Sequence, residues 1–341
     1  MARTSVALAT FNGEKYLGAQ LESLARQTVL PCELVVTDDR STDGTINIVR
    51  EFARNAPFPV HLDENTTRLG YRANFMHATE LCKADLIAYC DQDDIWEPEK
   101  IAVMEGLFDN PEILLAYHNA VVISEDGEPI GHLYASGPVV KTFAPLGLEP
   151  WSLVTGFTQV FRSSLRRFAT VHEASIDPYW PAQRLAHDQW HLFLASVFGS
   201  VVRVGQSLVR YRQHGENVFG WENKHSLETA PSHILQPESF IAAARNRSEL
   251  LRGLRSDLGE EQRSRADRAI AFYDDLARRL DDRMSMYSSA ALPARIRKFD
   301  TLLRQDAYSR AKGAARFGWK GLLLDAFGGV LLGPVAKRLI L

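Results

Sequence analysis

Short apolar runs alternate with stretches of helical periodicity over the first hundred residues of the chain. After the first run, Leu17, Leu21 and Leu24 recur at the spacing of one helix face, and Ile46 and Val49 repeat this after the second. The apolar runs have the length of buried strands and span residues 5–9, 33–37, 60–62 and 86–90. Strands that alternate with helices form right-handed βαβ units around a parallel sheet, so the pattern predicts an α/β fold.

A polar turn follows each of these predicted strands. The turns span residues 10–13, 38–45, 65–70 and 91–94. Because the carboxyl ends of parallel strands lie at one edge of a sheet, we expect the turns to form a single site, where such folds bind nucleotides. The sequence lacks both Gly-x-Gly-x-x-Gly and the glycines and lysine of a P-loop. We therefore expect a diphosphate bound here to need a metal ion.

The last of these turns places Asp91, Asp93 and Asp94 directly after an apolar strand. Clustered carboxylates repel one another unless a cation or hydrogen-bond donors compensate, which favours a divalent metal site. The other interpretation is a solvated acidic turn that caps the helix expected to begin near Pro98. The spacing alone is compatible with both.

The middle of the chain is less regular. Residues 113–118 and 120–124 are predicted as two strands around a turn, and residues 201–209 as strands around Gly205. Residues 125–150 are rich in Gly and Pro without clear periodicity, which predicts a mobile loop.

Several polar positions in this region are candidates for chemistry. Gly156 marks either a close approach to the backbone or a simple bend. Asp188 precedes an apolar helix and could be its N-cap, and His187 and His191 lack the Glu of a His-Glu-x-x-His metal motif. Arg212 and His214, at alternate positions of an extended segment, are suited to a phosphate or to ordinary structural roles.

The C-terminal third is helical in pattern, over residues 240–255, 262–286 and 293–316. From residue 295 onward, the sequence has ten basic residues and three acidic ones, and the basic residues are interleaved with aromatic residues. This pattern suits a helix on an anionic membrane surface, and equally a docked helical cap with a solvated face.

The composition narrows the remaining classes. A net charge of -3 does not indicate a nucleic-acid partner, and three cysteines without metal-ligand spacing are typical of free thiols in a reducing compartment. No signal segment or membrane-spanning run is predicted. We therefore expect a cytoplasmic protein, with a peripheral position on the inner face of the plasma membrane as an option for the basic tail.

Taken together, the motifs resemble the family-2 glycosyltransferases of the GT-A fold. The resemblance rests on residues 6–13, on Asp38-Asp39 with residues 41–45, and on residues 91–96. Residues 154–156, 187–188 and 211–215 are similar to the bacterial branch that includes rhamnosyltransferase-like enzymes. The resemblance implies a Rossmann-like, mostly parallel sheet flanked by helices over residues 1–222, with a nucleotide-binding half (about 1–110) and an acceptor half (about 111–222). Residues 223–341 are expected to form a helical, basic C-terminal extension.

The resemblance also implies roles for particular residues. Asp188 is similar to the family's general base, Asp93 to its ligand for Mg²⁺ or Mn²⁺, and Asp39 to the acid that accepts the imino N–H of a pyrimidine. Further candidates are Asp94, Gly156 and Trp96. The residues implied in binding the nucleotide and the donor are Thr10, Asn12, Asp39, Arg68, Asp91, Arg212 and His214.

The function implied is an inverting, metal-dependent glycosyltransferase. It would move a sugar from dTDP-rhamnose or a UDP-sugar to a saccharide or lipid-linked saccharide in cell-surface polysaccharide or O-antigen synthesis. Arg40 stands where the family usually has a small residue, which leaves the donor open. The alternative is a non-catalytic nucleotide-sugar-binding or scaffold protein, against which the presence of Asp188 argues. A nucleotidyltransferase should carry a glycine- and lysine-rich loop after the first strand, and residues 10–14 do not provide one.

Overall fold

The computed structural model describes residues 3–135, 137, 139–215, 217, 220, 237–309 and 316–336. The chain divides into two compact units. The first comprises Met1–Ala144, Leu153–Thr170 and Ala186–His225, and the second comprises Pro145–Ser152, Val171–Leu185 and Ser226–Leu341. The domain boundary predicted at residues 222–223 falls outside the described residues and stays a prediction.

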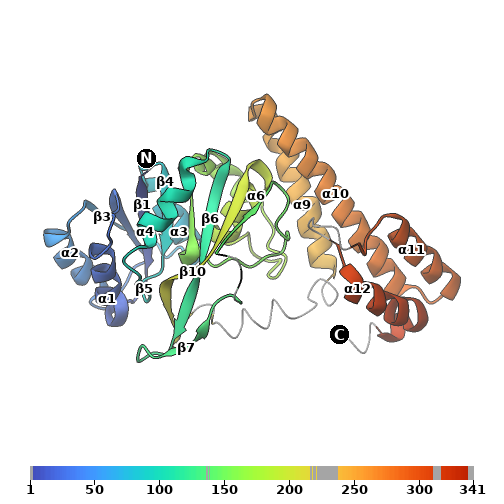
Figure 1. Ribbon diagram of the computed structural model, residues 1–341, viewed down its shortest axis with the longest axis horizontal. Helices are drawn as coiled ribbons and strands as arrows, with labels where there is room; N and C mark the ends of the chain where they lie inside the picture. Colours follow the sequence, from blue (N-terminus) through green and yellow to red (C-terminus); the bar gives the residue numbers. More distant parts are fainter. Residues whose placement is uncertain are drawn as a thin grey trace. The chain divides into compact units, whose positions relative to one another are not determined.

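The first unit is built on one mixed sheet of ten strands (Figure 1). The main path runs β3-β2-β1-β4-β9-β6-β10-β5, with β7 paired to β6 and β8 to β10. The first four strands of the path are all parallel, β9 runs antiparallel to both of its neighbours, and β6 is parallel to β10. The strands are β1 (Thr4–Thr10), β2 (Glu33–Asp38), β3 (Val60–Glu64), β4 (Leu86–Cys90), β5 (Ile95–Trp96), β6 (Ile113–Ile123), β7 (Pro129–His132), β8 (Val140–Phe143), β9 (Gln159–Arg162) and β10 (Ser200–Arg212).

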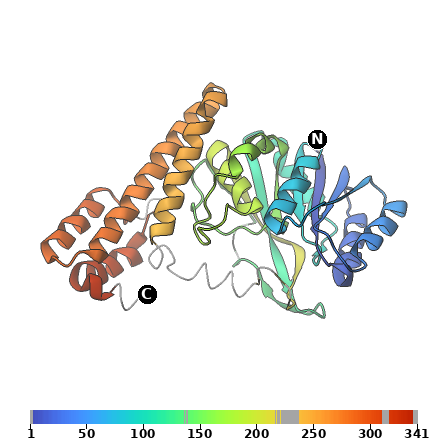
Figure 2. The ribbon, with the colours of Figure 1, turned by 180° about the vertical axis from the view of Figure 1, so that it is seen from behind.

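Helices connect these strands and cover the sheet. α3 packs on β1 and β2, α6 packs on β6 and β10, and the two helices also contact each other. Figure 2 shows this face toward the viewer, with α3 in light blue and α6 in yellow-green. The helices of this part of the chain are α1 (Glu14–Ala25), α2 (Thr45–Asn55), α3 (Tyr71–Leu81), α4 (Lys100–Glu105), α5 (Ala169–His172) and α6 (His187–Phe198), with 3₁₀ turns η1 (Gly106–Asp109), η2 (Gly156–Thr158) and η3 (Ser163–Phe168).

The predicted apolar faces meet in one core. Leu17, Leu21 and Leu24 of α1 are fully buried in the same cluster as Val6 and Leu8 of β1. Burial of such side chains contributes about 1.5–3 kcal/mol each, which explains why the helical spacing of these leucines identified the helix face correctly. The predicted α/β fold with a mostly parallel sheet is confirmed.

Three local predictions were wrong. Residues 113–123 form the single strand β6 rather than two, because the buried Asn119 accepts hydrogen bonds from the Ala120 and Tyr134 amides and so stays within the strand. Residues 201–209 were predicted as strands around Gly205, but they belong to the single strand β10. A shift in the pairing register with β6 between Val204 and Ser207 accommodates the glycine. The segment 125–150, predicted as a loop, contains β7 and β8.

The second unit contains a group of helices whose bounds differ in part from those predicted. They are α9 (Pro237–Leu254), η4 (Arg255–Asp257), α10 (Glu260–Ser288), α11 (Leu292–Arg304), α12 (Gly318–Leu324) and the π-helical η5 (Asp325–Leu332). α10 contacts α9, α11 and η5. The helix predicted to reach Arg316 ends at Arg304, and Asp306 just beyond it adopts a positive φ of 54°. No helix among the described residues is long and apolar enough to cross a membrane.

Candidate active site

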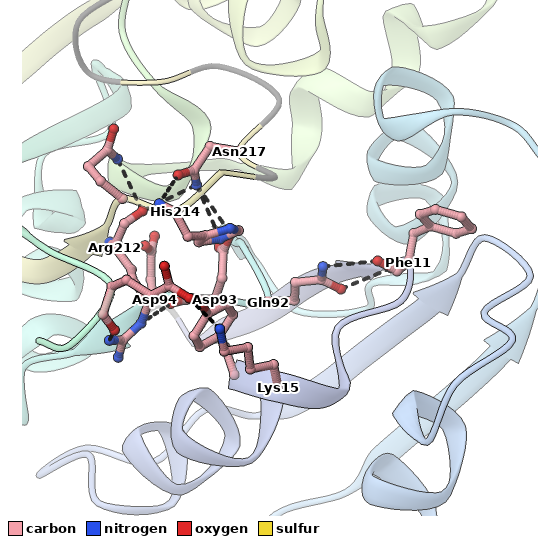
Figure 3. Close-up of polar contacts among 11 residues, drawn as sticks. Phe11, Lys15, Gln92, Asp93, Asp94, Arg212, His214 and Asn217 are labelled. Atoms are coloured by element: carbon pink, nitrogen blue, oxygen red, sulfur yellow. Dashed lines mark hydrogen bonds and ion pairs between the residues drawn. The ribbon is translucent and has the colours of Figure 1, made fainter.

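The polar turns that follow the parallel strands are joined to one another by hydrogen bonds. The Asn12 amide donates to Ser41 Oγ at 2.8 Å, and the Gly13 amide donates to Thr45 Oγ1 at 2.7 Å. The Gln92 side chain accepts from the Phe11 amide at 2.9 Å and donates to the Phe11 carbonyl at 3.0 Å (Figure 3). The turns after β1, β2 and β4 therefore form one connected site, as the strand order predicted.

Three carboxylates gather after β4. One oxygen from each of Asp91, Asp93 and Asp94 lies within 4.8 Å of the others. Asp94 is 0% exposed; its Oδ1 accepts from the Arg212 amide at 3.0 Å, and its Oδ2 has no hydrogen-bond partner among the described residues. Burying a carboxylate with one unsatisfied oxygen and two acidic neighbours costs free energy. A cation or a hydrogen-bond donor bound at this position would offset that cost.

The electrostatics of these acids reflect burial and mutual repulsion. Burial, followed by the charges of Asp93 and Asp188, raises the pKa of Asp91 to about 8. Burial, followed by the charges of Asp93 and Asp91, raises the pKa of Asp94 well above its ordinary value. Both effects favour a bound proton at these positions until a positive charge arrives.

Lys100 provides a buried positive charge near this group. Its ammonium donates to the Phe157 carbonyl at 2.7 Å and lies 3.4 Å from the centroid of the Trp96 ring. Burial lowers the pKa of Lys100 to about 7, while its charge lowers the pKa of Asp91 and Asp94. Trp96, a candidate from the sequence, is buried. Its ring contacts the ammonium of Lys100, and Lys100 in turn acts on Asp91 and Asp94.

Asp93 is held by the segment that ends β10. Its Oδ2 lies 2.8 Å from His214 Nε2 and accepts from Asn217 Nδ2 at 3.4 Å (Figure 3). The Arg212 guanidinium donates through Nε to the Asp93 carbonyl at 3.1 Å and through Nη1 to the Glu125 carbonyl at 2.8 Å. The two residues predicted from the alternation in this segment thus both meet the acidic turn.

Tyr16 of α1 supports this arrangement. Its ring centroid is 4.8 Å from that of His214 and 5.1 Å from the Arg212 guanidinium carbon, and its hydroxyl donates to Glu125 Oε1 at 3.0 Å. Lys15 forms an ion pair with the same Glu125 carboxylate. Tyr16 therefore links the first helix of the sheet to the two residues beside Asp93.

Asp188 stands in the first turn of α6, where its Oδ1 accepts from the Gln189 amide at 2.7 Å. The charge of Asp188 raises the pKa of Asp91. The two residues therefore belong to one site although they are 97 positions apart in the sequence. A Cβ added at Gly156 would lie 2.8 Å from His187 Nε2 and 3.4 Å from the Asp188 Cβ. A side chain at 156 would therefore displace His187, the neighbour of Asp188, which favours close approach over a simple bend.

The neighbouring histidines are part of the core. His187 stacks on Phe75 at 4.1 Å, and His191 stacks on Phe161 at 4.2 Å while its Nδ1 lies 2.8 Å from the Tyr89 hydroxyl. The acidic group after β4 is the only cluster of metal-ligating side chains among the described residues. The i, i+4 histidine pair is explained by packing.

The residues expected around the nucleotide lie along the same edge. Asp39 is buried and accepts from the Leu69 amide at 2.6 Å and the Gly70 amide at 2.8 Å. A carboxylate has about four lone-pair directions, so Asp39 can accept a further hydrogen bond. The exposed Arg68 guanidinium lies 3.8 Å from the Phe11 ring centroid and 4.0 Å from Asp39.

Three further positions in these turns carry constraints of their own. The Thr10 hydroxyl donates to Asp38 Oδ2 at 2.8 Å, and Asn12 Oδ1 accepts from the Thr42 amide at 2.9 Å. Arg40 adopts a φ of 66°, in the left-handed region that favours glycine. This explains why a small residue suits position 40, and here the strained backbone is accompanied by a hydrogen bond from Arg40 Nη1 to the Thr66 carbonyl at 2.9 Å.

Sequence reasoning missed Tyr16, Gln92, Lys100 and Asn217. Lys100 and Tyr16 lie within helical patterns, where a polar residue is normally solvated. Gln92 stands between two candidate acids, and Asn217 follows the predicted Arg212 and His214. Their position next to predicted site residues could therefore have identified them from the sequence.

Comparison with known sequences identifies the family. Residues 5–169 match the family described as glycosyl transferase family 2. The chain carries a family-2 glycosyltransferase domain. The match covers the parallel half of the sheet, the acidic turn and Gly156, and it agrees with the predicted family.

Relatives of this glycosyltransferase domain occur in several bacteria. The chain is 27% identical over 219 residues to an uncharacterised protein of Mycobacterium tuberculosis, covering 63% of this chain and 60% of that protein. It is 25% identical over 223 residues to an uncharacterised glycosyltransferase of Nostoc sp., covering 63% and 66%. A shorter match, 35% identical over 98 residues, covers 28% of this chain and 34% of the dTDP-rhamnosyl transferase RfbG of Shigella flexneri. The chain thus spans 60% of the length of the mycobacterial relative.

The glycosyltransferase also resembles solved structures. S. aureus TarS, residues 1–349, in complex with UDP aligns with a TM-score of 0.53 at 18% identity, covering 90% of this chain and 93% of that one. The same protein in complex with UDP-GlcNAc aligns with a TM-score of 0.52. At this identity the likeness shows the fold alone, and it agrees with the predicted GT-A architecture.

Proposed function

We propose that the chain is an inverting, metal-dependent glycosyltransferase that moves a sugar from a nucleoside-diphosphate donor to a saccharide acceptor. The observation that carries the proposal is the group formed by Asp91, Asp93 and Asp94, whose electrostatics include the charge of Asp188. A binding protein has a use for the first three acids, but a fourth carboxylate, Asp188, whose charge acts on Asp91, would serve a reaction.

The acidic group fits a hard divalent cation. Carboxylate oxygens are the ligands that Mg²⁺ and Mn²⁺ prefer, and the unsatisfied Oδ2 of Asp94 leaves a ligand position open. Asp93 would hold the ion, with Asp91 on the nucleotide side and Asp94 as a further ligand or as a contact to the donor sugar. A bound ion would supply positive charge to the departing diphosphate.

The surrounding residues are suited to the nucleotide. Asp39 would accept the imino N–H of a pyrimidine base, with Thr10 and Asn12 beside the nucleoside and Arg68 near the ribose or phosphates. Arg212 and His214, both in contact with Asp93, would donate to the diphosphate as negative charge develops on it.

Asp188 would act as the general base. Its carboxylate takes the proton of the acceptor hydroxyl, and the acceptor oxygen forms a bond to the anomeric carbon of the sugar. The bond from that carbon to the diphosphate oxygen breaks, and the electron pair leaves with the nucleoside diphosphate. Attack from the face opposite the leaving group inverts the anomeric configuration.

Donor and acceptor are proposed from the relatives. The name of RfbG favours dTDP-rhamnose and the TarS complexes favour a UDP-sugar. The acceptor would be a saccharide or lipid-linked saccharide in cell-surface polysaccharide or O-antigen synthesis. A lipid-linked acceptor would bring the enzyme to the inner face of the plasma membrane, and the basic C-terminal extension is the part of the chain suited to such a surface.

A panel of donors tests the proposal. Release of nucleoside diphosphate is measured with dTDP-rhamnose, UDP-glucose and UDP-N-acetylglucosamine, with saccharide acceptors, in the presence of Mn²⁺ or EDTA. We expect release with one donor class that EDTA abolishes. Binding of nucleotide without release from any donor would instead support the alternative of a non-catalytic nucleotide-sugar-binding protein.

A further inference from the structure

The helix formed by α12 and η5 exposes four of its apolar residues and buries its one acidic residue. Trp319, Leu323, Phe327 and Leu331 follow one another every four residues and are 51%, 48%, 62% and 60% exposed. Asp325, in the middle of the same helix, is 0% exposed. This inverts the usual pattern of a surface helix, which turns its apolar side chains toward the core. The four exposed side chains are called the apolar ridge below.

The orientation of this helix is fixed from its buried side. Asp325 accepts hydrogen bonds from Arg283 Nε at 2.8 and 2.9 Å, and from the hydroxyls of Tyr287 and Tyr308, each at 2.8 Å. A Cβ added at Gly329 would lie 2.4 Å from Met286 Cε. The helix therefore cannot rotate to bury the ridge without breaking the Asp325 network and forcing side chains into α10.

The change of helix type keeps the ridge straight. In an α-helix a spacing of four residues advances about 40° beyond one turn, whereas in the wider π-helix it falls short of one turn. Trp319 and Leu323 lie in α12, and Phe327 and Leu331 lie in η5. Because the two drifts oppose each other, the four side chains stay on one line.

The C-terminal extension has more basic than acidic residues. From residue 295 to the end of the chain, the sequence has ten basic residues and three acidic ones, Asp300, Asp306 and Asp325. Each of these three acids forms an ion pair, with Arg304, Arg316 and Arg283 respectively. Lys320, next to Trp319, is exposed, as is Arg297 on α11, the helix that contacts η5.

We propose that the apolar ridge docks on the surface of an anionic lipid bilayer. A line of one Trp, one Phe and two Leu side chains suits the boundary between headgroups and acyl chains, and the exposed Lys320 and Arg297 suit anionic headgroups. The three acidic side chains of this segment, all among the described residues, are each paired with an arginine and so repel such a membrane less. The proposal concerns binding alone and does not depend on the sugar-transfer reaction.

Co-sedimentation with vesicles tests the proposal. The intact chain is mixed with phosphatidylcholine vesicles with and without phosphatidylglycerol, at low and high salt. We expect binding to the anionic vesicles that weakens with salt. The double variant Phe327→Ser/Leu331→Ser should lower the partition by about tenfold or more. Lys320→Glu should lower it by about fivefold or more on anionic vesicles only.

Ile130→Ser is the matched control, because Ile130 is similarly exposed but lies on β7 in the first unit. It should bind as the wild type does, and the thermal unfolding of all variants should match because the substituted side chains are on the surface. The proposal is overturned if the wild type does not bind anionic vesicles, or if the double variant binds equally well. It is also overturned if the wild type is a dimer that the double variant breaks without any vesicle binding, since the ridge would then join two copies of the chain.

Discussion

Asp94 and Asp325 are both completely buried aspartates, yet their surroundings differ in every respect. Asp325, in the C-terminal helical unit, has a paired arginine and two tyrosine hydroxyls on its two oxygens. Asp94, at the end of β4, has one backbone amide on one oxygen and two other carboxylates beside it. Both oxygens of Asp325 are hydrogen-bonded, whereas Oδ2 of Asp94 has no hydrogen-bond partner among the described residues.

The difference separates a structural role from a functional one. A buried charge that is paired and fully hydrogen-bonded fixes a local arrangement, as Asp325 fixes the orientation of η5. A buried charge that is left incomplete costs stability and is retained where a ligand completes it. Burial alone does not distinguish the two cases; the count of partners does.

The largest expected effect is on catalysis at Asp188. Asp188→Asn removes the proposed base and should lower the rate of sugar transfer by about 10²–10⁴-fold, because proton transfer then has no acceptor. Donor affinity, measured by calorimetry, should change little. Transfer at the wild-type rate in this variant would refute the assignment of Asp188.

The next effect separates the two buried acids by stability. Asp325→Asn leaves Arg283 as an uncompensated buried charge and should lower the free energy of unfolding of the C-terminal unit by about 3–5 kcal/mol. Asp94→Asn should leave the metal-free protein at least as stable, because a neutral amide avoids the cost of ionising a buried carboxyl beside Asp91 and Asp93, while abolishing transfer. Denaturant unfolding of both variants measures this, and equal losses of stability would break the comparison.

Gly156→Ala should act on turnover through geometry. The added methyl group forces the His187 ring, next to Asp188, to shift, and a displacement of this kind near a reacting group lowers kcat by about 10–100-fold. Gly18→Ala is the control, because a Cβ at Gly18 of α1 meets nothing within 4 Å. Gly18→Ala should retain full activity, and a comparable loss in both variants would show that the effect is not specific to Asp188.

The smallest effect is expected at Tyr16. Tyr16→Phe removes the hydrogen bond to Glu125 but keeps the ring against His214 and Arg212, so KM for the donor should rise by about fivefold at most. Tyr16→Leu removes the ring contacts as well and should raise KM further. If both substitutions have the same effect, the ring contacts with the two residues beside Asp93 do not position them.

The sequence predicted the features that depend on the periodicity of apolar residues and on the order of strands and helices along the chain. The leucines of α1 and the apolar strand that ends at Cys90 predicted the α/β fold and the edge of the sheet along which Asp39 and Asp91 both lie. The splitting of β6 at Asn119 was wrong because a polar residue within a strand can satisfy its own neighbours, and the pattern does not display that hydrogen bond.

Residues whose role depends on three-dimensional contacts were beyond such reasoning. Lys100 can be buried because its ammonium donates a hydrogen bond to the Phe157 carbonyl and lies over the Trp96 ring. These partners are 57 and 4 positions away in the sequence. The inverted exposure of Trp319 and Asp325 follows from Arg283, Tyr287 and Tyr308, none of which the helical period reveals. The composition of the tail indicated a membrane or a docked cap, and the burial of Asp325 identifies which face is turned outward.

The most direct test of the acidic group as a cation site is Mn²⁺ binding, followed by electron paramagnetic resonance in the presence of UDP or dTDP. Burial and like charges raise the pKa of Asp91 from 3.8 to about 8, so the metal-free protein binds a proton there that the unfolded chain has lost. Stability without metal should therefore fall as the pH rises from about 4 to 8, and Mn²⁺ should bind more tightly over the same range.

We predict one Mn²⁺ site in the wild type that strengthens toward pH 8, is lost in Asp93→Asn, and is unchanged in the exposed control Asp109→Asn. Absence of this site in the wild type, or its persistence in Asp93→Asn, would contradict the account.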